Sequence, residues 1–184
     1  MPRIATVDSP GPLARIAYAV ARRRFGKVPE PLTVWAHHRG VLLATIRHES
    51  AVARWKALDR TCKSLAVLRA AQVIGCPWCI DFGSFLSKDE GVTAEQLRDL
   101  HRWRDSSAYT TDQRLCLEYA EAASRTPLEV TDELVAALVS ALGEKAVVEL
   151  AMMIALENER SRFNGALGLV SQGYSTEACA VVPA

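Results

Sequence analysis

The stretch Gly75-Cys76-Pro77-Trp78-Cys79-Ile80-Asp81-Phe82 follows the segment Leu65 to Ile74, in which only Arg69 and Gln72 are not apolar. So apolar a segment predicts a helix that is buried on most of its sides. Gly75 is suited to end this helix in a left-handed conformation, and Pro77 is suited to the first turn of the next one. The two cysteines then lie at a helix N-terminus, where free N–H groups and the helix dipole stabilise a thiolate.

Helical periodicity extends along the rest of the chain, without convincing strand alternation. An amphipathic helix is expected around residues 13–20, and Pro29 and Pro31 separate it from a second helix, which runs from Leu32 to about Leu43. A further helical stretch continues through Trp55. Asp59 is placed to cap the apolar helix of residues 65–74. The pattern predicts an all-α fold.

The C-terminal half is also predicted to be helical. Thr93 and Gln96 have the spacing of a capping box, and helices are expected over residues 115–123 and from about Glu144 past Arg160. Residues 63–83 and 145–165 can also be aligned with matched apolar positions, which raises the possibility of two related helical halves. In that alignment Asn158 and Ser161 occupy the places of Cys76 and Cys79, so only the first half would carry redox chemistry.

Composition excludes several classes of function. The 184 residues include 22 basic and 21 acidic side chains, for a formal net charge of +1, and no polybasic tract accompanies an aromatic stacking motif. We therefore expect no nucleic-acid partner. The first residues lack the order of a signal peptide, and no apolar run approaches the roughly 20 residues that span a bilayer. We expect a soluble cytoplasmic protein that does not bind a membrane.

Five cysteines in a chain of this length do not indicate a secreted disulfide framework. A single Cys-x-x-Cys also lacks the second pair of ligands that a structural zinc site requires, so we expect no metal and no other cofactor. Cys62 and Cys116 lie in helical contexts and are interpreted as packing residues. Cys179, near the C-terminus, is interpreted as a mobile free thiol.

Several of these residues occur together in a known family. Lys63 to Gln72, Gly75 to Phe82 and Gly91-Val92 resemble the core of the carboxymuconolactone decarboxylase and AhpD-like alkylhydroperoxidase family, and Tyr119 to Ala122 with Thr126-Pro127 is similar to its longer members. The resemblance covers roughly residues 32–170. It implies a single AhpD-like helical domain over residues 1–184, with the N-terminal residues and the C-terminal tail flexible. It also implies a homo-oligomer, often a trimer or hexamer.

The resemblance also implies roles for single residues. In the AhpD-like peroxidases the second cysteine attacks the peroxide and the first resolves the sulfenic acid, which here assigns Cys79 as nucleophile and Cys76 as resolving thiol. A Glu twelve residues before the first cysteine and a His four residues after the second relay protons in that family. This chain has Ser64 and Gly83 at those positions, and neither can act as an acid or base near neutral pH.

A replacement for the proton relay must come from another helix, because Phe82, Gly83 and Leu86 surround Cys79 on its own helix. Glu149 lies in an apolar run and could be a buried carboxylate. Glu157, Asn158 and Arg162 form a polar cluster further along the same helix. For all of these the alternative interpretation is an ion pair or a hydrogen bond that closes a helix end.

Other polar and aromatic residues have simpler interpretations. Glu118 and Glu121 are expected on a solvated helix face. Trp78 could cover the disulfide or shape an entrance for an apolar hydroperoxide, and the simpler interpretation is an ordinary packing aromatic. The histidines are interpreted mainly as surface or core residues without a role at Cys79; they are His37, His38, His48 and His101.

The sequence is compatible with three functions. The first is a thiol-dependent hydroperoxidase or disulfide oxidoreductase that cycles Cys76 and Cys79 and needs a thiol or dithiol reductant. The second is a family member without peroxidase activity, with a redox-sensing or structural cysteine pair and an unknown small-molecule ligand; Ser64 and Gly83 favour it. The third, a decarboxylase, is the least supported, because the family's decarboxylases do not rely on a Cys-x-x-Cys.

Overall fold

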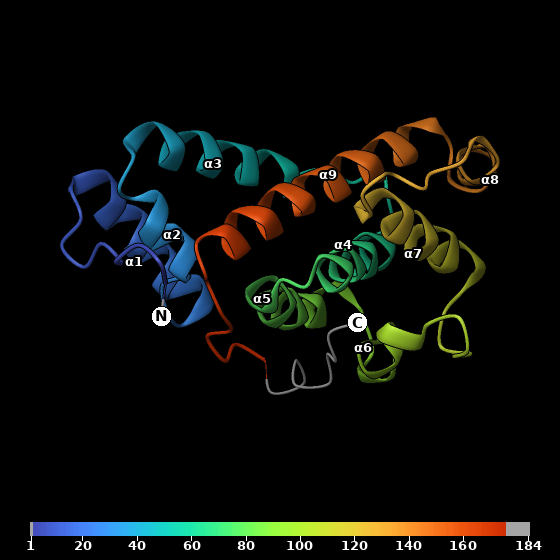
Figure 1. Cartoon of the computed structure of the whole chain (residues 1–184), viewed down its shortest axis with the longest axis horizontal. Coiled ribbons are helices and arrows are strands. Elements are labelled where there is room, and N and C mark those ends of the chain that lie inside the picture. The colour runs from blue at the N-terminus through green and yellow to red at the C-terminus, as the bar shows by residue number, and fades with distance from the viewer. Residues whose placement is uncertain (1, 176–184) are drawn as a thin grey trace.

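The computed structural model describes residues 2–175, and this part of the chain is built from helices without strands (Figure 1). The prediction of an all-α fold is confirmed. Four helices form the central bundle: α4 (Arg60–Ile74), α5 (Pro77–Ser87), α7 (Thr111–Ser124) and α9 (Glu144–Ala166). The other elements are α1 (Pro12–Phe25), α2 (Glu30–Trp35), α3 (Arg39–Val52), η1 (Lys88–Glu90), α6 (Ala94–Asp99), η2 (Leu100–Arg102) and α8 (Asp132–Leu142).

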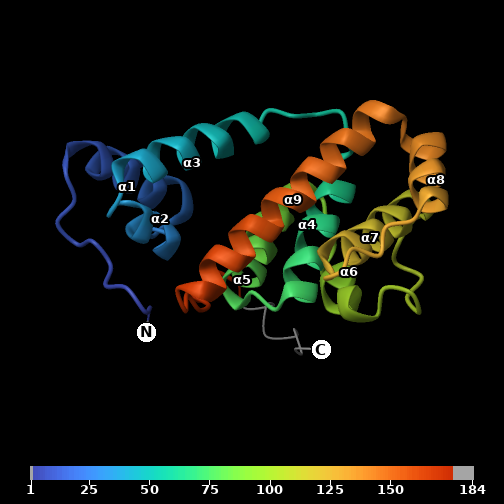
Figure 2. The same ribbon diagram turned by 45° about the horizontal axis from the view of Figure 1, so that its top comes forward.

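Helix α4 is the centre of the fold. It packs against α7, α9 and α5, as Figures 1 and 2 show, and Leu65, Ala66 and Ala70 have no exposed surface. The predicted burial of this apolar helix is confirmed. Cys62 and Cys116 are buried free thiols in the core between α4, α7 and α9, in agreement with their interpretation as packing residues. Cys179 lies outside the described residues.

The helix boundaries around the cysteines follow the predicted capping residues. The Asp59 carboxylate accepts a hydrogen bond from the Cys62 N–H at 3.0 Å, so α4 begins at Arg60, before its apolar segment. Gly75 ends α4 with a φ of 77°, a left-handed conformation that disfavours a side chain. Thr93 and Gln96 form the predicted capping box of α6. Local chemistry therefore determines where α5 starts and places Cys76 at its N-cap.

The prediction of one helix from Leu32 to about Leu43 is wrong. Helix α2 ends at Trp35, and α3 begins at Arg39. Between them His38 has an extended backbone, and its imidazole Nδ1 accepts a hydrogen bond from the Val41 N–H at 3.2 Å. The His38 side chain thus acts as the N-cap of a new helix, which ends at Val52 instead of continuing through Trp55.

The N-terminal helices α1, α2 and α3 form a group of their own beside the bundle (Figure 2). Aromatic contacts join this group to the helices that carry the site: Trp35 lies 6.5 Å from Phe163, and Phe25 lies 5.1 Å from Phe82, between ring centroids. Val34 of α2 packs in one apolar cluster with both cysteines. The group therefore covers the cysteines on one side.

The two segments with matched apolar positions differ in structure. The first is interrupted at Gly75 and Cys76, where α4 ends and α5 starts, whereas the second is one continuous helix through Asn158 and Ser161. A common origin of the two segments stays a prediction. Without a break, α9 has no second helix N-terminus at Ser161, so only the first segment offers a thiol-activating helix end.

Glu121 corrects a further expectation, because it is buried instead of solvated. Its carboxylate accepts hydrogen bonds from Arg69 Nε at 2.6 Å, Trp103 Nε1 at 2.9 Å and Arg104 Nη1 at 2.5 Å. Burial by itself would raise the pKa of Glu121, but the hydrogen bonds from Trp103 and Arg104 and the charge of Arg69 outweigh it and hold the pKa below its usual value. Glu118, one turn earlier, is exposed as expected.

We predict that Glu121→Ala lowers the free energy of unfolding by about 3 to 5 kcal/mol, because it leaves Arg69 Nε and Trp103 Nε1 without their acceptor. Urea unfolding at pH 7 measures the loss, with exposed Glu118→Ala as control, expected to change stability by less than about 0.5 kcal/mol. Since the folded pKa of Glu121 is lowered, its contribution is present above the unfolded pKa and disappears as the pH falls through the folded pKa. Equal losses in the two variants would contradict this account.

Candidate functional site

The site begins with a disulfide between Cys76 and Cys79, whose Cα atoms are 5.3 Å apart. Cys76 is the N-cap of α5, and its Sγ accepts a hydrogen bond from the Cys79 N–H at 3.2 Å. Both residues are buried, and Cys79 is the more exposed, at 6% against 1% for Cys76. The predicted placement of the pair at a helix N-terminus is confirmed, so a backbone donor is available to a thiolate at this position.

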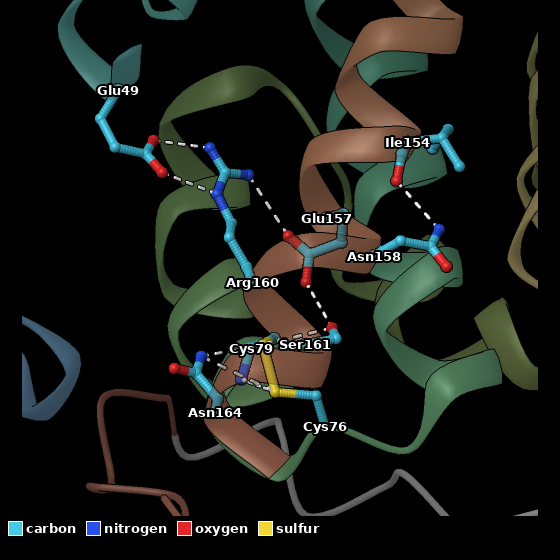
Figure 3. Close-up of polar contacts among 9 residues, drawn as sticks. All are labelled: Glu49, Cys76, Cys79, Ile154, Glu157, Asn158, Arg160, Ser161 and Asn164. Atoms are coloured by element: carbon cyan, nitrogen blue, oxygen red, sulfur yellow. Dashed lines mark hydrogen bonds and ion pairs between the residues drawn. A yellow bond between two sulfur atoms is a disulfide. The ribbon is translucent and has the colours of Figure 1, made fainter. Parts of the chain in front are cut away.

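Helix α9 supplies the polar side chains that face the sulfurs (Figure 3). The Ser161 hydroxyl lies 3.4 Å from Cys79 Sγ, and the Asn164 Nδ2 group donates to the same sulfur at 3.3 Å. Asn164 Nδ2 is also 4.0 Å from Cys76 Sγ. Both donors therefore favour Cys79, which is the cysteine that needs help from outside its own helix.

Glu157 continues this line of contacts away from the sulfur. Its Oε1 lies 2.9 Å from the Ser161 hydroxyl, and its side chain is buried. Burial raises the pKa of Glu157 to about 7, although the charge of Arg160 and the hydrogen bond from Ser161 lower it. A hydroxyl can accept one proton while it donates its own. Ser161 can therefore carry a proton between Cys79 and a carboxyl group that titrates near neutral pH.

Arg160 connects this carboxylate to the N-terminal helices. Its Nε and Nη2 donate to the two oxygens of Glu49 in α3 at 2.8 and 2.6 Å, whereas its Nη1 lies 3.3 Å from Glu157 Oε2. Figure 3 shows the guanidinium between the two carboxylates. The guanidinium thus makes its short, bidentate contact with Glu49 and only a longer contact with Glu157.

The other predicted supporting residues on α9 lie elsewhere. Glu149 is in an ion pair with Lys63 and accepts a hydrogen bond from the Ala57 N–H at 2.7 Å. It precedes Ser161 by about 18 Å along the helix axis, at a rise of about 1.5 Å per residue. Asn158 donates to the Ser124 hydroxyl at 3.2 Å and to the Ile154 carbonyl at 3.0 Å. These contacts match the alternative interpretation, in which both residues are structural.

Trp78 lies between the cysteines in sequence and packs against their helix. Its ring is stacked on Phe82 at 4.8 Å between centroids, and its Nε1 donates to Gln172 Oε1 at 2.9 Å. Among the described contacts, none joins Trp78 to a sulfur through a polar atom. The structure thus favours its interpretation as a packing residue that anchors the segment after α9.

Asp81, five residues after Cys76, is turned away from the sulfurs and holds the segment after α9. It accepts hydrogen bonds from the Gln172 and Ser175 N–H groups, each at 2.8 Å, and from the Ser171 hydroxyl at 2.9 Å. Burial would raise the pKa of Asp81, but these hydrogen bonds lower it below its usual value. Asp81 is therefore an ionised structural anchor rather than a proton carrier for Cys79.

The two positions of the family relay have no acid or base in this structure either. A Cβ atom at Gly83 would lie only 2.8 Å from Leu68 Cδ2, so a larger side chain there requires Leu68 to move. Ser64 is a buried residue of α4. The sequence did not identify Ser161 and Asn164 as partners of Cys79, because they are 82 and 85 residues away from it along the chain. The one available signal was the alignment that paired Ser161 with Cys79.

Two cavities lie away from the cysteines. The larger, of about 570 Å³, is lined by Arg69, Arg125 and Arg162 together with His101 and parts of α4 and α7, and the smaller, of about 170 Å³, lies beside it at Arg125 and Glu129. Neither cavity is lined by the disulfide or by Glu157. His101 contacts the Arg98 carbonyl at 3.0 Å, and His48 is half-buried in α3.

Residues 2–175 form the range in which metal ligands and membrane-spanning helices can be assessed. This range contains no group of three His, Cys, Asp or Glu side chains arranged to hold a metal ion. It also contains no helix that is both long and apolar enough to cross a membrane.

Known proteins share both the sequence pattern and the fold. Residues 40–122 match the carboxymuconolactone decarboxylase family. The uncharacterized protein YnjA of Escherichia coli (strain K12) is 33% identical over 153 residues, which cover 83% of this chain and 84% of that protein.

Two solved structures show the same architecture. An uncharacterized peroxidase-related protein with an alkylhydroperoxidase AhpD core, from Ralstonia eutropha JMP134, has a TM-score of 0.83 at 15% identity and covers 100% of this chain and 98% of its own. The debrominase Bmp8 in its apo form has a TM-score of 0.82 at 17% identity and covers 93% of this chain and 92% of its own. The sequence matches show that the chain belongs to the carboxymuconolactone decarboxylase family, and the solved structures show that it has the AhpD-like fold.

Proposed function

We propose that this protein is a thiol-dependent peroxidase that reduces hydroperoxides with Cys79 as nucleophile and Cys76 as resolving thiol. The observation that carries the proposal is the position of Ser161, whose hydroxyl lies 3.4 Å from Cys79 Sγ and 2.9 Å from Glu157 Oε1. This chain of contacts replaces the acid and base that are missing at Ser64 and Gly83. It connects only to Cys79, which supports the assignment of the two roles.

In the first step, ionised Glu157 takes the proton of the Cys79 thiol through Ser161. The thiolate, which Asn164 Nδ2 stabilises, attacks one peroxide oxygen. A sulfur–oxygen bond forms, the oxygen–oxygen bond breaks, and the departing alkoxide receives the proton from Glu157 through Ser161. The products are an alcohol and the Cys79 sulfenic acid, so sulfur is oxidised by two electrons and the peroxide is reduced.

In the second step, the Cys76 thiol attacks the sulfenic sulfur and water leaves, which forms the disulfide of the structure. An external thiol or dithiol then reduces this disulfide and completes the cycle. The family resemblance also supports a homo-oligomer, trimeric or hexameric, made of single-domain subunits. A cytoplasmic location, where thiol reductants are abundant, is part of the same proposal.

A second candidate is a redox-sensing or structural disulfide without peroxidase turnover. The observation that favours it is the burial of both cysteines, at 1% and 6% exposure, since a sensor or a structural bond needs no bound substrate. The two candidates differ in whether peroxide is consumed repeatedly in the presence of a reductant.

We predict that pre-reduced protein loses two thiols for each cumene hydroperoxide consumed, and that Cys79→Ser abolishes this reaction. Cys76→Ser is expected to undergo one oxidation, to a sulfenic acid, without turnover with a dithiol reductant. Thiol titration, peroxide assay and mass spectrometry measure these quantities, with Cys179→Ser as control. Normal turnover by Cys76→Ser would contradict the assigned roles, and oxidation as slow as that of an ordinary exposed cysteine would favour the second candidate.

We predict that Ser161→Ala slows Cys79 oxidation about a hundredfold at pH 7, because it interrupts the proton path. In the wild type the rate should rise with pH through about 7, as Glu157 becomes able to accept a proton, and Glu157→Gln should lack this rise. Rapid-quench measurement of thiol oxidation between pH 5.5 and 8.5 tests both expectations. Ser87→Ala is the matched control, since its buried hydroxyl donates only to the Ser84 carbonyl of its own helix.

The Glu49–Arg160 pair should determine the pH at which this rise occurs. The charged or titratable groups around Glu157 are Arg160, Glu49 and the reduced Cys79 thiol, and Arg160 makes its short contacts with Glu49. Without the charge of Glu49, the guanidinium is free to pair with Glu157 and to lower its pKa. We predict that Glu49→Gln moves the rise in oxidation rate to a lower pH, whereas exposed Glu159→Gln does not. An unchanged profile would show that Glu49 has only a structural role.

A further inference from the structure

One polar atom beside the disulfide is left without a partner. Asn164 is buried, at 2% exposure, and its Nδ2 group donates to Cys79 Sγ, but its Oδ1 has no hydrogen bond within the part of the chain that the structure describes. Figure 3 shows the amide nitrogen directed toward the sulfurs and the oxygen directed away from them. An unpaired buried carbonyl costs about 1 to 3 kcal/mol. A ligand that supplies a hydrogen-bond donor at this point would remove the cost.

We propose that Asn164 Oδ1 accepts a hydrogen bond from the O–H group of a hydroperoxide that is bound for attack by Cys79. This inference rests on the proposed peroxidase function and adds a substrate-binding residue to it. The two ends of one amide then have different tasks: Nδ2 stabilises the attacking sulfur, and Oδ1 orients the oxygen that is attacked.

The distances allow this arrangement. The nitrogen and oxygen of a carboxamide are about 2.3 Å apart, as bond lengths of about 1.3 and 1.2 Å imply. With Nδ2 at 3.3 Å from Cys79 Sγ, Oδ1 is thus within about 5.6 Å of the sulfur. The value of about 5.6 Å is an upper limit that applies when the sulfur, Nδ2 and Oδ1 are collinear. When the three atoms form a bent arrangement, the gap is shorter, and one oxygen atom can lie beside Nδ2 at a reacting distance of about 3.3 Å from sulfur and a hydrogen-bond distance of about 2.8 Å from Oδ1.

The same contact defines the class of substrate. In hydrogen peroxide and monoalkyl hydroperoxides, the oxygen that thiolates attack carries a hydrogen atom, which can be donated to Oδ1. A dialkyl peroxide or a carbon–halogen bond has no such donor, so it would leave Oδ1 unpaired and buried. The hydrogen bond does not change the balance of the reaction: the sulfur still gains oxygen, and the alkoxide still leaves with the proton from Glu157.

A comparison of two reagents separates this role from thiolate stabilisation. All variants carry Cys76→Ser, so that Cys79 reacts alone, and mass spectrometry follows its modification. tert-Butyl hydroperoxide has the O–H group, whereas methyl methanethiosulfonate reacts with the same thiolate and has no O–H or N–H. Asn164→Leu removes both ends of the amide, and Asn164→Asp retains an oxygen acceptor. Asn158→Leu, on the same helix without a sulfur contact, is the matched control.

We expect Asn164→Leu to lower the ratio of the hydroperoxide rate to the thiosulfonate rate about tenfold, the effect of one lost hydrogen bond. Asn164→Asp is expected to slow both reagents and to leave the ratio within about twofold of the parent. This variant also tests the inference if Asn164→Leu does not fold. An unchanged ratio in Asn164→Leu, or an equal fall of the ratio in Asn164→Asp, would overturn the inference. If the parent reacts with the thiosulfonate but not with the hydroperoxide, the proposed function itself fails.

Discussion

The packing of α9 across the start of α5 is the constraint on which the site depends. It places Ser161 and Asn164 within 3.4 Å of Cys79 Sγ, although neither residue is near the cysteines in sequence. The contact is possible because Gly75 ends α4 in a left-handed conformation and lets the chain turn into a new helix at Cys76. Since α4, α5 and α9 pack against one another, a shift of α9 would separate the sulfur from the polar neighbours that this helix supplies.

Burial gives the site its electrostatic character. Burial raises the pKa of Glu157 to about 7, and the charge of Glu49 also raises it, whereas Arg160, which makes its shorter contacts with Glu49, lowers it. The same guanidinium ties α3 to α9, so the N-terminal helices contribute to the site without providing a reacting group. Glu121 is also buried, but the donors around it outweigh the effect of burial, so its pKa is lowered and it remains ionised. The number of donors that face each carboxylate decides between the two cases.

In the proposed mechanism, residues of another helix take the part of the family relay. Gly83 lies so close to Leu68 that a side chain there would need rearrangement, and Ser64 is enclosed in α4. The polar groups near Cys79 come instead from the opposite helix. A different helix can serve one sulfur because a proton path requires only short distances between successive donors and acceptors, whatever their order in the chain.

The sequence by itself determined the all-helical fold, the burial of α4, the two ends of α4, the starts of α5 and α6, and the position of the cysteine pair at a helix N-terminus. These features depend on local periodicity and on capping residues within a few positions, such as Asp59, Gly75 and Thr93. The break at His38 was missed, because histidine is not a usual N-cap residue. Helix boundaries are sensitive to such single side-chain hydrogen bonds.

Only the tertiary structure decided which polar residues meet Cys79. Glu157 and Asn158 are neighbours in sequence, yet Glu157 reaches Ser161 beside the sulfur, whereas Asn158 contacts Ser124 on α7. Adjacent residues on a helix point about 100° apart, so the orientation of α9 against α5 determines which of them belongs to the site. That orientation results from the packing of apolar surfaces on several helices, a long-range property that no short stretch of sequence contains.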